Sequence, residues 1–374
     1  MNFNEFFLKS FRILLFPLAC LYGLVIIVRN WMYRKGWLQS AKFSFPIICV
    51  GNLSVGGTGK SPFVEYLLRL LHREFKVATL SRGYKRKTKG YTLAGLKTTA
   101  LDIGDEPMQF HKKFSDVAVA VGEDRYVAIT QMLQDLPRLD AIILDDAFQH
   151  RSVVAGLNIL LTDYNDLYPA DFFLPTGNLR DEWSSARRAQ IIVVTKCPPN
   201  LDLEEKERLR KLINPLAYQK LYFTCIKYGT PYHILDAGNE WNLTTQDEVL
   251  LVTGIANPEP LKEYLHENAQ TYYQKSYRDH HIFTIDDLEE ILEQFKEITT
   301  GRKIILTTEK DAVRLEKFAQ QLANIPLYVI PIQHRFLFGE GYQFNEQIIR
   351  YIEEHKNPFQ PHGKEESETK KEKA

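Results

Sequence analysis

A glycine-rich segment that begins at residue 54 carries the clearest chemical signal in this sequence. It reads SVGGTGKS, follows a short apolar run and leads into an amphipathic stretch that ends near Leu71. Glycines in such a loop let backbone N–H groups turn toward a polyphosphate, the lysine reaches the outer phosphates, and the next hydroxyl ligates Mg²⁺. Serine stands where the common phosphate-loop pattern has its first glycine. We predict a nucleotide-binding loop made of Ser54, Val55, Gly56, Gly57, Thr58, Gly59, Lys60 and Ser61.

Two adjacent aspartates form a second group that can bind a ligand. Asp145 and Asp146 directly follow the apolar run Ala141–Leu144. Ligands collect at the carboxyl ends of parallel strands, so we expect this pair to meet the phosphate loop and share Mg²⁺ with Ser61. A single aspartate after a strand more often caps a helix, but two in succession beside a phosphate loop favour a metal role.

The residues themselves do not select the nucleotide. A guanine-selective site carries an Asn-Lys-x-Asp sequence at a strand end. The nearest segment, Thr195–Pro198 (TKCP), lacks the acidic residue. Selective binding of guanine is therefore unsupported.

Short apolar runs rich in Ile and Val alternate with amphipathic or polar stretches along most of the chain. Such runs suit parallel strands covered by helices on both faces, so we predict an α/β fold with a P-loop-type, mostly parallel sheet and a second, smaller α/β domain. The expected divisions are 1–36 for an N-terminal membrane-associated helix, 37–220 for the P-loop domain, 221–355 for the smaller domain with connector strands and 356–374 for a charged, disordered tail. The expected strands are Pro46–Gly51, Lys76–Leu80, Val117–Val121, Ala141–Leu144, Leu157–Leu161, Ile191–Val194, Val249–Val252, Lys303–Leu306 and Pro326–Ile330.

The N-terminal segment Ile13–Val28 has the composition of a membrane-associated helix. It carries no charge and is bounded by Arg12 and Arg29. A full span needs about 20 residues, and this shorter stretch contains Pro17 and Gly23. A helix lying in one leaflet therefore explains it at least as well as a spanning helix, and a buried core helix is the alternative. A cleavable signal peptide is disfavoured because no small-residue cleavage pattern follows.

Composition excludes several classes of protein. At roughly 150 residues per domain, the 374 residues suggest two domains, and 44% hydrophobic with 25% charged residues argues against global disorder and against a multi-span transporter. Lys plus Arg and Asp plus Glu both number 47, so a zero net charge gives no support for nucleic-acid binding. None of the four cysteines forms a C-x-x-C pair, which argues against a zinc ribbon or a dithiol redox site.

Further short motifs follow the phosphate loop: SRGY at 81–84, GDEP at 104–107, DDAFQH at 145–150, PTGNLR at 175–180, TGI at 253–255, DHH at 279–281 and TEKD at 308–311. In these motifs and their order, the chain resembles the tetraacyldisaccharide 4′-kinase family from about residue 10 to residue 350. Members of that family also place a small hydroxyl residue at the position of Ser54. This chain departs from the family pattern at Ala147, where glycine is common, and at Asp181, which precedes Glu182 where the family has glutamate directly after Leu-Arg.

The resemblance implies a specific reaction. It is the Mg²⁺-dependent transfer of the ATP γ-phosphoryl group to the 4′-hydroxyl of a tetraacylated glucosamine disaccharide 1-phosphate, an inner-membrane step of lipid A biosynthesis. The implied partners are this lipid and the membrane surface at its cytoplasmic face, whereas protein partners stay unknown. The resemblance assigns Lys60 to the phosphates and Asp105 as the base that receives the hydroxyl proton. It pairs Asp105 with a histidine of the second domain, for which we choose His280 over the adjacent His281.

Other assignments are open to more than one interpretation. By itself, GDEP indicates a helix N-terminus with Asp105 as its cap. Arg82 and Tyr84 follow a strand and can contact the substrate, although Arg82 equally suits a surface ion pair. Glu106 can assist Mg²⁺ or the substrate. Two alternative functions are a membrane-tethered P-loop nucleotide switch without lipid kinase activity and a scaffold with a vestigial nucleotide site.

Overall fold

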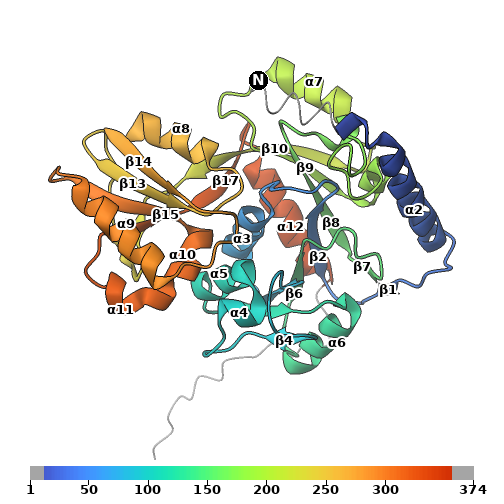
Figure 1. Cartoon of the computed structure of the whole chain (residues 1–374). Helices are drawn as coiled ribbons and strands as arrows, with labels where there is room; N and C mark the ends of the chain where they lie inside the picture. The colour runs from blue at the N-terminus through green and yellow to red at the C-terminus, as the bar shows by residue number, and fades with distance from the viewer. Residues whose placement is uncertain (1–11, 356–374) are drawn as a thin grey trace, which may run out of the picture.

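The computed structural model describes residues 12–355, which form two α/β lobes (Figure 1). The expected tail at 356–374 lies outside the described residues. A nine-stranded sheet builds the larger lobe, and most of its strand pairs are parallel. In spatial order its strands are β17 (Ile332–Phe336), β10 (Lys220–Tyr228), β9 (Ile191–Thr195), β8 (Leu157–Asp163), β2 (Ile47–Asn52), β6 (Ala141–Asp145), β3 (Val77–Ser81), β5 (Ala118–Val121) and β4 (Thr92–Leu93).

Helices cover both faces of this sheet. Its central strands β2, β3, β6 and β9 are buried along their whole length, which explains their continuous Ile and Val content. Side chains of α3, α5 and α12 fill the core on one face, and those of α6 and α7 fill the core on the other. The helices are α3 (Lys60–Leu71), α4 (Ala100–Ile103), α5 (Asp105–Lys113), α6 (Arg125–Asp135), α7 (Leu203–Ile213) and α12 (Gly341–His355).

The smaller lobe contains a six-stranded sheet with its own core. Strands β13, β14, β15 and β16 pair in parallel, while β11 and β12 pair antiparallel at one edge. Apolar residues of α9 pack on one face and those of α8 on the other. The elements are β11 (Tyr232–His233), β12 (Asp236–Glu240), β13 (Glu248–Thr253), α8 (Glu259–Asn268), β14 (Thr271–Ser276), α9 (Ile285–Glu297), β15 (Lys303–Thr308), α10 (Glu309–Leu315), α11 (Ala319–Leu322) and β16 (Leu327–Ile330).

Two strands connect the lobes. β10 pairs with β9 through its first residues and with β17 through its later ones, so the chain leaves the larger lobe along β10 and returns along β17. The helix α12 then packs on the large sheet, where Tyr351 hydroxyl donates to the carbonyl of Ile47 at 3.1 Å. The range 221–355, expected for the smaller domain with connector strands, contains nearly all of β10 together with β17 and α12, and these three elements belong to the nine-stranded sheet and its cover.

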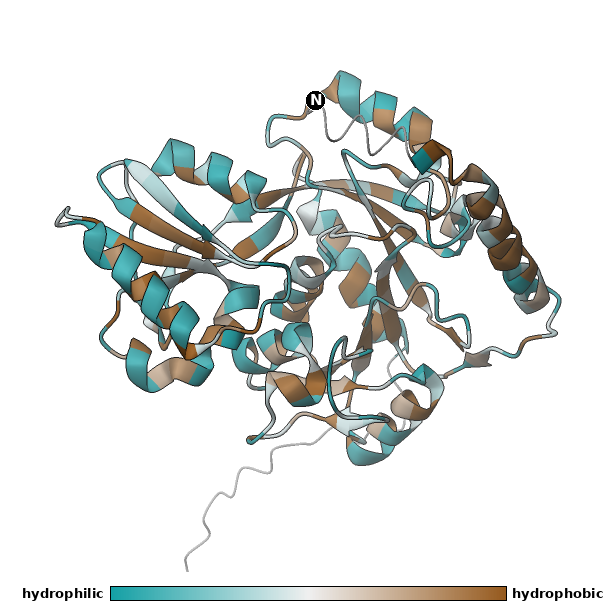
Figure 2. Ribbon diagram, in the orientation of Figure 1, coloured by the Kyte–Doolittle hydropathy of each residue, from teal (hydrophilic) through white to brown (hydrophobic). Residues whose placement is uncertain are grey.

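The apolar N-terminal segment forms α2 (Phe16–Arg34), which is long and apolar enough to cross a membrane. This helix lies along the outside of the larger lobe, and hydrophobic residues make up most of its ribbon (Figure 2). Most of its large apolar side chains are exposed. Gly23 permits close approach, because a Cβ there would lie 2.6 Å from the ring of Phe173. A small two-stranded sheet of β1 (Ala41–Lys42) and β7 (Val153–Val154) follows it.

Polar contacts fasten the inner face of α2 to the segment after the PTGNLR motif. The buried Asn30 side chain donates to Asp181 Oδ1 at 2.7 Å and to Glu182 Oε1 at 3.1 Å. Arg34 forms a 2.7 Å ion pair with the same Glu182 oxygen. Tyr22 hydroxyl donates to the Arg180 carbonyl at 3.1 Å. Asp181 and Glu182 thus serve as the docking site of α2.

Candidate active site

The phosphate loop, the acidic pair and the SRGY motif lie side by side at the carboxyl ends of strands in the large sheet. They follow β2, β6 and β3, which are adjacent strands of parallel direction. The loop turns through left-handed backbone at Gly56 (φ 110°) and Gly59 (φ 79°), where a side chain would be strained. The helix α3 begins at Lys60, and Ser61 lies in its first turn. This arrangement is the one the sequence predicts for a site that binds a polyphosphate.

A partly buried polar network holds Lys60 beside the acidic pair. Its Nζ lies 3.3 Å from Asn52 Oδ1 and 3.7 Å from Asp146 Oδ1. Arg180 donates to Asn52 Oδ1 at 2.5 Å and forms an ion pair with Asp146. Burial opposes ionisation of Asp146, but Lys60 and Arg180 outweigh it and keep the pKa of this aspartate below its ordinary value. The phosphate loop and the acidic pair therefore share one site.

Asp145 has the environment of a cation ligand. It is 2% exposed, and its Oδ1 has no hydrogen-bond partner among the described residues. Burial, with Glu106 and Asp146 close by, raises the pKa of Asp145 to about 8. A divalent cation would satisfy the free oxygen and favour the ionised form, so these carboxylates fit Mg²⁺.

The number of protein carboxylates also suits Mg²⁺. Within residues 12–355, no group of three or more His, Cys, Asp or Glu side chains has the geometry to hold a metal by itself. Mg²⁺ is usually held by one or two carboxylates together with substrate phosphates and water, so it does not need such a group. The roles of Ser61, Asp145, Asp146 and Glu106 as ligands stay predictions.

Asp105 and His280 meet across the two lobes. Asp105 opens α5 of the larger lobe, and His280 Nδ1 lies 3.1 Å from its Oδ2. His280 has left-handed backbone (φ 63°), a strained conformation for a non-glycine residue that is common at functional sites. Its amide donates to the carbonyl of Gly254 at the end of β13. The neighbouring His281 points elsewhere, pairing with Asp287 at 2.9 Å. The geometry thus joins the two residues that the resemblance pairs.

The SRGY motif borders this pair. The ring of Tyr84 is 66% exposed and its centroid lies 5.4 Å from that of His280. Arg82 is exposed at the end of β3, close enough to His150 and Arg125 to lower the pKa of each, although burial is the larger cause. Both residues are exposed, and their substrate role stays a prediction.

Sequence reasoning missed Arg125, which begins α6 behind the acidic pair. It is 1% exposed, and its Nε and Nη2 have no hydrogen-bond partner in the described chain. Burial lowers the pKa of Arg125 to about 10, while Asp145 and Asp146 oppose that change. A buried guanidinium with free donors near two carboxylates can bind a phosphate group or join those carboxylates in one polar network. Its position just after the strand that ends at Val121 was the available signal.

His334 was missed as well. This residue of β17 is 4% exposed, its Nε2 lies 2.9 Å from the carbonyl of Gly59, and its Nδ1 lies 3.0 Å from Thr224 Oγ1. Because a carbonyl only accepts, Nε2 carries the proton and Thr224 donates to Nδ1. A connecting strand thus supports the phosphate loop.

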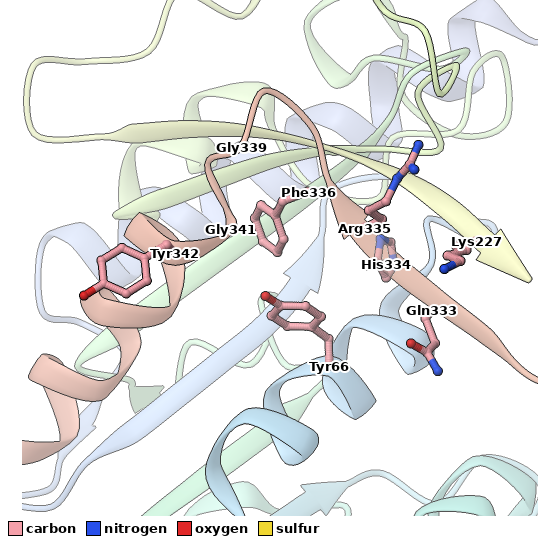
Figure 3. A pocket seen from close by; sticks show the side chains of 9 residues that line it. All are labelled: Tyr66, Lys227, Gln333, His334, Arg335, Phe336, Gly339, Gly341 and Tyr342. Atoms are coloured by element: carbon pink, nitrogen blue, oxygen red, sulfur yellow. The ribbon is translucent and has the colours of Figure 1, made fainter. Parts of the chain in front are cut away.

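His334 also lines a cavity of about 390 Å³ between α3, β17 and the start of α12 (Figure 3). Tyr66, Phe336 and Tyr342 supply its aromatic walls, and Arg335 and Lys227 its charges. None of the predicted catalytic, metal or substrate residues lines this cavity. It therefore lies behind the phosphate loop and outside the site described above.

Comparisons with known proteins agree with this geometry. Residues 11–353 match the family described as tetraacyldisaccharide-1-P 4′-kinase. A tetraacyldisaccharide 4′-kinase of Flavobacterium johnsoniae is 47% identical over 350 residues, covering 93% of this chain and 99% of that protein. One from Bacteroides fragilis strain YCH46 is 43% identical, covering 91% of this chain and 93% of that protein.

A solved structure is similar over the same length. It is the "apo" form of LpxK from Aquifex aeolicus in complex with ATP, and it superimposes with a TM-score of 0.70 at 29% identity. The match covers 91% of this chain and 99% of the Aquifex chain. The comparisons give no support to the alternative of a nucleotide switch without kinase activity. On its motifs, its two-lobed fold and these matches, the chain belongs to the tetraacyldisaccharide-1-P 4′-kinase family.

Proposed function

We propose that this protein transfers the γ-phosphoryl group of ATP to the 4′-hydroxyl of a tetraacylated glucosamine disaccharide 1-phosphate. The observation that carries the proposal is the 3.7 Å approach of Lys60 Nζ to Asp146 Oδ1, since a triphosphate held by the loop then reaches the acidic pair. Membership of the family supplies the chemical class of the acceptor. The Aquifex relative was solved in complex with ATP, which supports ATP as the donor.

Phosphoryl transfer depends mainly on positioning and on neutralising charge. In this proposal the loop N–H groups and Lys60 bind the outer phosphates, and Ser61, Asp145, Asp146 and Glu106 hold Mg²⁺. When bound, Mg²⁺ neutralises charge that develops on the β- and γ-phosphate oxygens. The side chains of Arg82 and Tyr84 contact the sugar or its phosphate.

Asp105 accepts the proton of the attacking hydroxyl, and His280 orients its carboxylate. Burial acts to raise the pKa of Asp105, but Arg314 and His280 outweigh it and lower the pKa, so the carboxylate is ionised and carries no proton of its own. Because Asp105 and His280 come from different lobes, apposition of the lobes assembles the base and excludes water from the reaction.

We further propose that α2 lies on the cytoplasmic face of the inner membrane without crossing it. Its inner side is hydrogen-bonded to the larger lobe through Asn30, Arg34 and Tyr22. Large apolar side chains such as Leu21 and Leu24 stay exposed. Exposed Phe172 and Trp183 extend the apolar surface beside it. A helix docked along one side and apolar along the other suits burial in one leaflet. A substrate with four acyl chains stays in the bilayer, so the site must work at the membrane surface.

The test supplies labelled ATP, Mg²⁺ and a detergent-dispersed tetraacyl disaccharide 1-phosphate, and measures formation of a bisphosphorylated lipid. We expect product from the native chain and a large loss in both Lys60→Ala and Asp105→Ala. Lys317→Ala is the matched lysine control, because Lys317 lies on the smaller lobe outside the site. Native turnover in both Lys60→Ala and Asp105→Ala would show that the roles are assigned wrongly.

A further inference from the structure

The TEKD motif leads into α10, a short helix of the smaller lobe that contacts α5 of the larger one (Figure 1). From α10, Arg314 reaches across the lobe boundary to Asp105. Its Nε lies 3.0 Å and its Nη2 2.7 Å from Asp105 Oδ2. Arg314 is 8% exposed, and its Nη1 donates to Asp311 Oδ1 at 3.1 Å, so the guanidinium is held on two sides.

The contacts to Asp105 are unevenly shared between its two oxygens. Both Arg314 bonds and the His280 bond end on Oδ2. Within the described part of the chain, no side-chain hydrogen bond ends on Oδ1. A carboxylate fixed through one oxygen presents the other in a defined direction, and that oxygen keeps its lone pairs for a new proton.

Lys310, one helical turn before Arg314, contacts the ring of His280. Its Nζ lies 3.2 Å from His280 Nε2 and 3.3 Å from Asp279 Oδ1. An ammonium group only donates, so Nε2 accepts and the ring proton resides on Nδ1, where it donates to Asp105 Oδ2. Arg314 Nη2 lies 3.1 Å from that Nδ1, because both nitrogens donate to the same oxygen. Residues four apart share one face of a helix, so α10 can contact His280 through Lys310 and Asp105 through Arg314.

We propose that Arg314 is a positioning residue of the phosphoryl transfer, fixing Oδ2 of Asp105 so that Oδ1 receives the proton of the attacking hydroxyl. Lys310 assists by setting the tautomer of His280. This inference rests on the proposed function and deepens it, because it makes α10 a part of the reaction site. An ion pair of Lys113 with Glu309 joins α5 to α10, and one of Lys112 with Glu316 joins α5 to the turn that directly follows α10. Apposition of the lobes therefore delivers the histidine and the arginine to Asp105 together.

The test compares steady-state kinetics of Arg314→Ala and Arg314→Lys with the native chain in the lipid-phosphorylation assay. A misplaced base of this kind costs on the order of 100-fold in kcat, and we expect that loss for Arg314→Ala with the KM for ATP unchanged. Arg314→Lys should recover only part of it, because one ammonium cannot reproduce the two bonds of the guanidinium fork. Added guanidinium ion, below denaturing concentration, should restore part of the kcat of Arg314→Ala.

The matched control is Arg302→Ala. Arg302 also pairs with a buried carboxylate of the smaller lobe, Asp247, at 2.8 Å, but lies outside the site. We expect it to keep native kcat and to gain nothing from guanidinium.

Two results would overturn the inference alone. One is native kcat in Arg314→Ala. The other is a loss accompanied by lower thermal stability and weaker ATP binding, with no rescue by guanidinium, because a merely structural arginine would behave in that way. Absence of product from the native chain would overturn the proposed function, and the inference with it.

Discussion

His334→Gln tests whether the strand that returns from the smaller lobe supports the phosphate loop. Glutamine has no nitrogen at the Nδ1 position, so the substitution removes the acceptor of the 3.0 Å bond from Thr224, and only an amide N–H remains to replace the 2.9 Å bond to the Gly59 carbonyl. A buried group left without its partner costs about 1–3 kcal/mol. At pH 7 we therefore expect the variant to be less stable by that amount and to bind ATP more weakly.

The pH dependence of this effect has a definite sign. Burial lowers the pKa of His334 from 6.5 to about 4. Below pH 6.5 the unfolded chain takes up a proton that the folded chain excludes until about pH 4, so stability is fully present above pH 6.5 and is lost as the pH falls. One pKa unit corresponds to about 1.4 kcal/mol, so between pH 6.5 and pH 5 the native chain loses roughly 2 kcal/mol that the glutamine variant keeps.

The assay is chemical unfolding of both proteins at pH 7 and at pH 5. The difference between them should shrink by roughly 2 kcal/mol at the lower pH. His355→Gln is the control, since its side chain on α12 is exposed and lies outside the phosphate-loop contacts. A difference that is the same at both pH values would refute the reasoning about His334.

Three further predictions concern nucleotide binding, helix docking and the lobe boundary. At a nucleotide concentration 100 times its Kd, ATP should stabilise the native chain by about 2.7 kcal/mol, and calorimetry should show that Lys60→Ala loses this gain. Asn30→Leu leaves the carboxylate of Asp181 without its amide donor, and we expect a loss of about 1–3 kcal/mol with faster proteolysis within α2. Burial beside Glu65 raises the pKa of Glu309 to about 7, so the native chain should lose stability as pH rises from 4.5 to 7. Unfolding measurements should show that Glu309→Gln flattens this decline by roughly 3 kcal/mol at most.

The strands and the phosphate loop were predictable because their signals are local. Buried parallel strands need continuous apolar runs, and all nine expected runs appear as strands, with ends shifted by at most a few residues. Strand order then brings Lys60 and Asp145 close together, since they lie at the carboxyl ends of the neighbouring parallel strands β2 and β6. That part of the site follows from sequence periodicity and from the geometry of parallel sheets.

The rest of the fold and of the site depends on contacts between segments far apart in the sequence, and no local sequence pattern encodes such contacts. Arg314 lies 209 residues from Asp105, and His334 lies 275 residues from Gly59. β17 is short and half exposed, so its sequence gives no indication that it adds an antiparallel edge to the large sheet. Asp181 and Glu182 depart from the family pattern, but the sequence did not indicate that they bind α2, because their partner Asn30 lies within a segment whose apolar residues dominate its sequence.

The most direct measurement of the central claim is the position of the phosphate gained by the lipid. After incubation with ATP and Mg²⁺, phosphorus and proton NMR of the purified product should show one new monoester at the 4′-oxygen of the distal sugar. Asp105→Asn, which keeps the shape of the side chain but not its basicity, should yield little of it. A phosphate at another position, or native yield from Asp105→Asn, would contradict the account of this site.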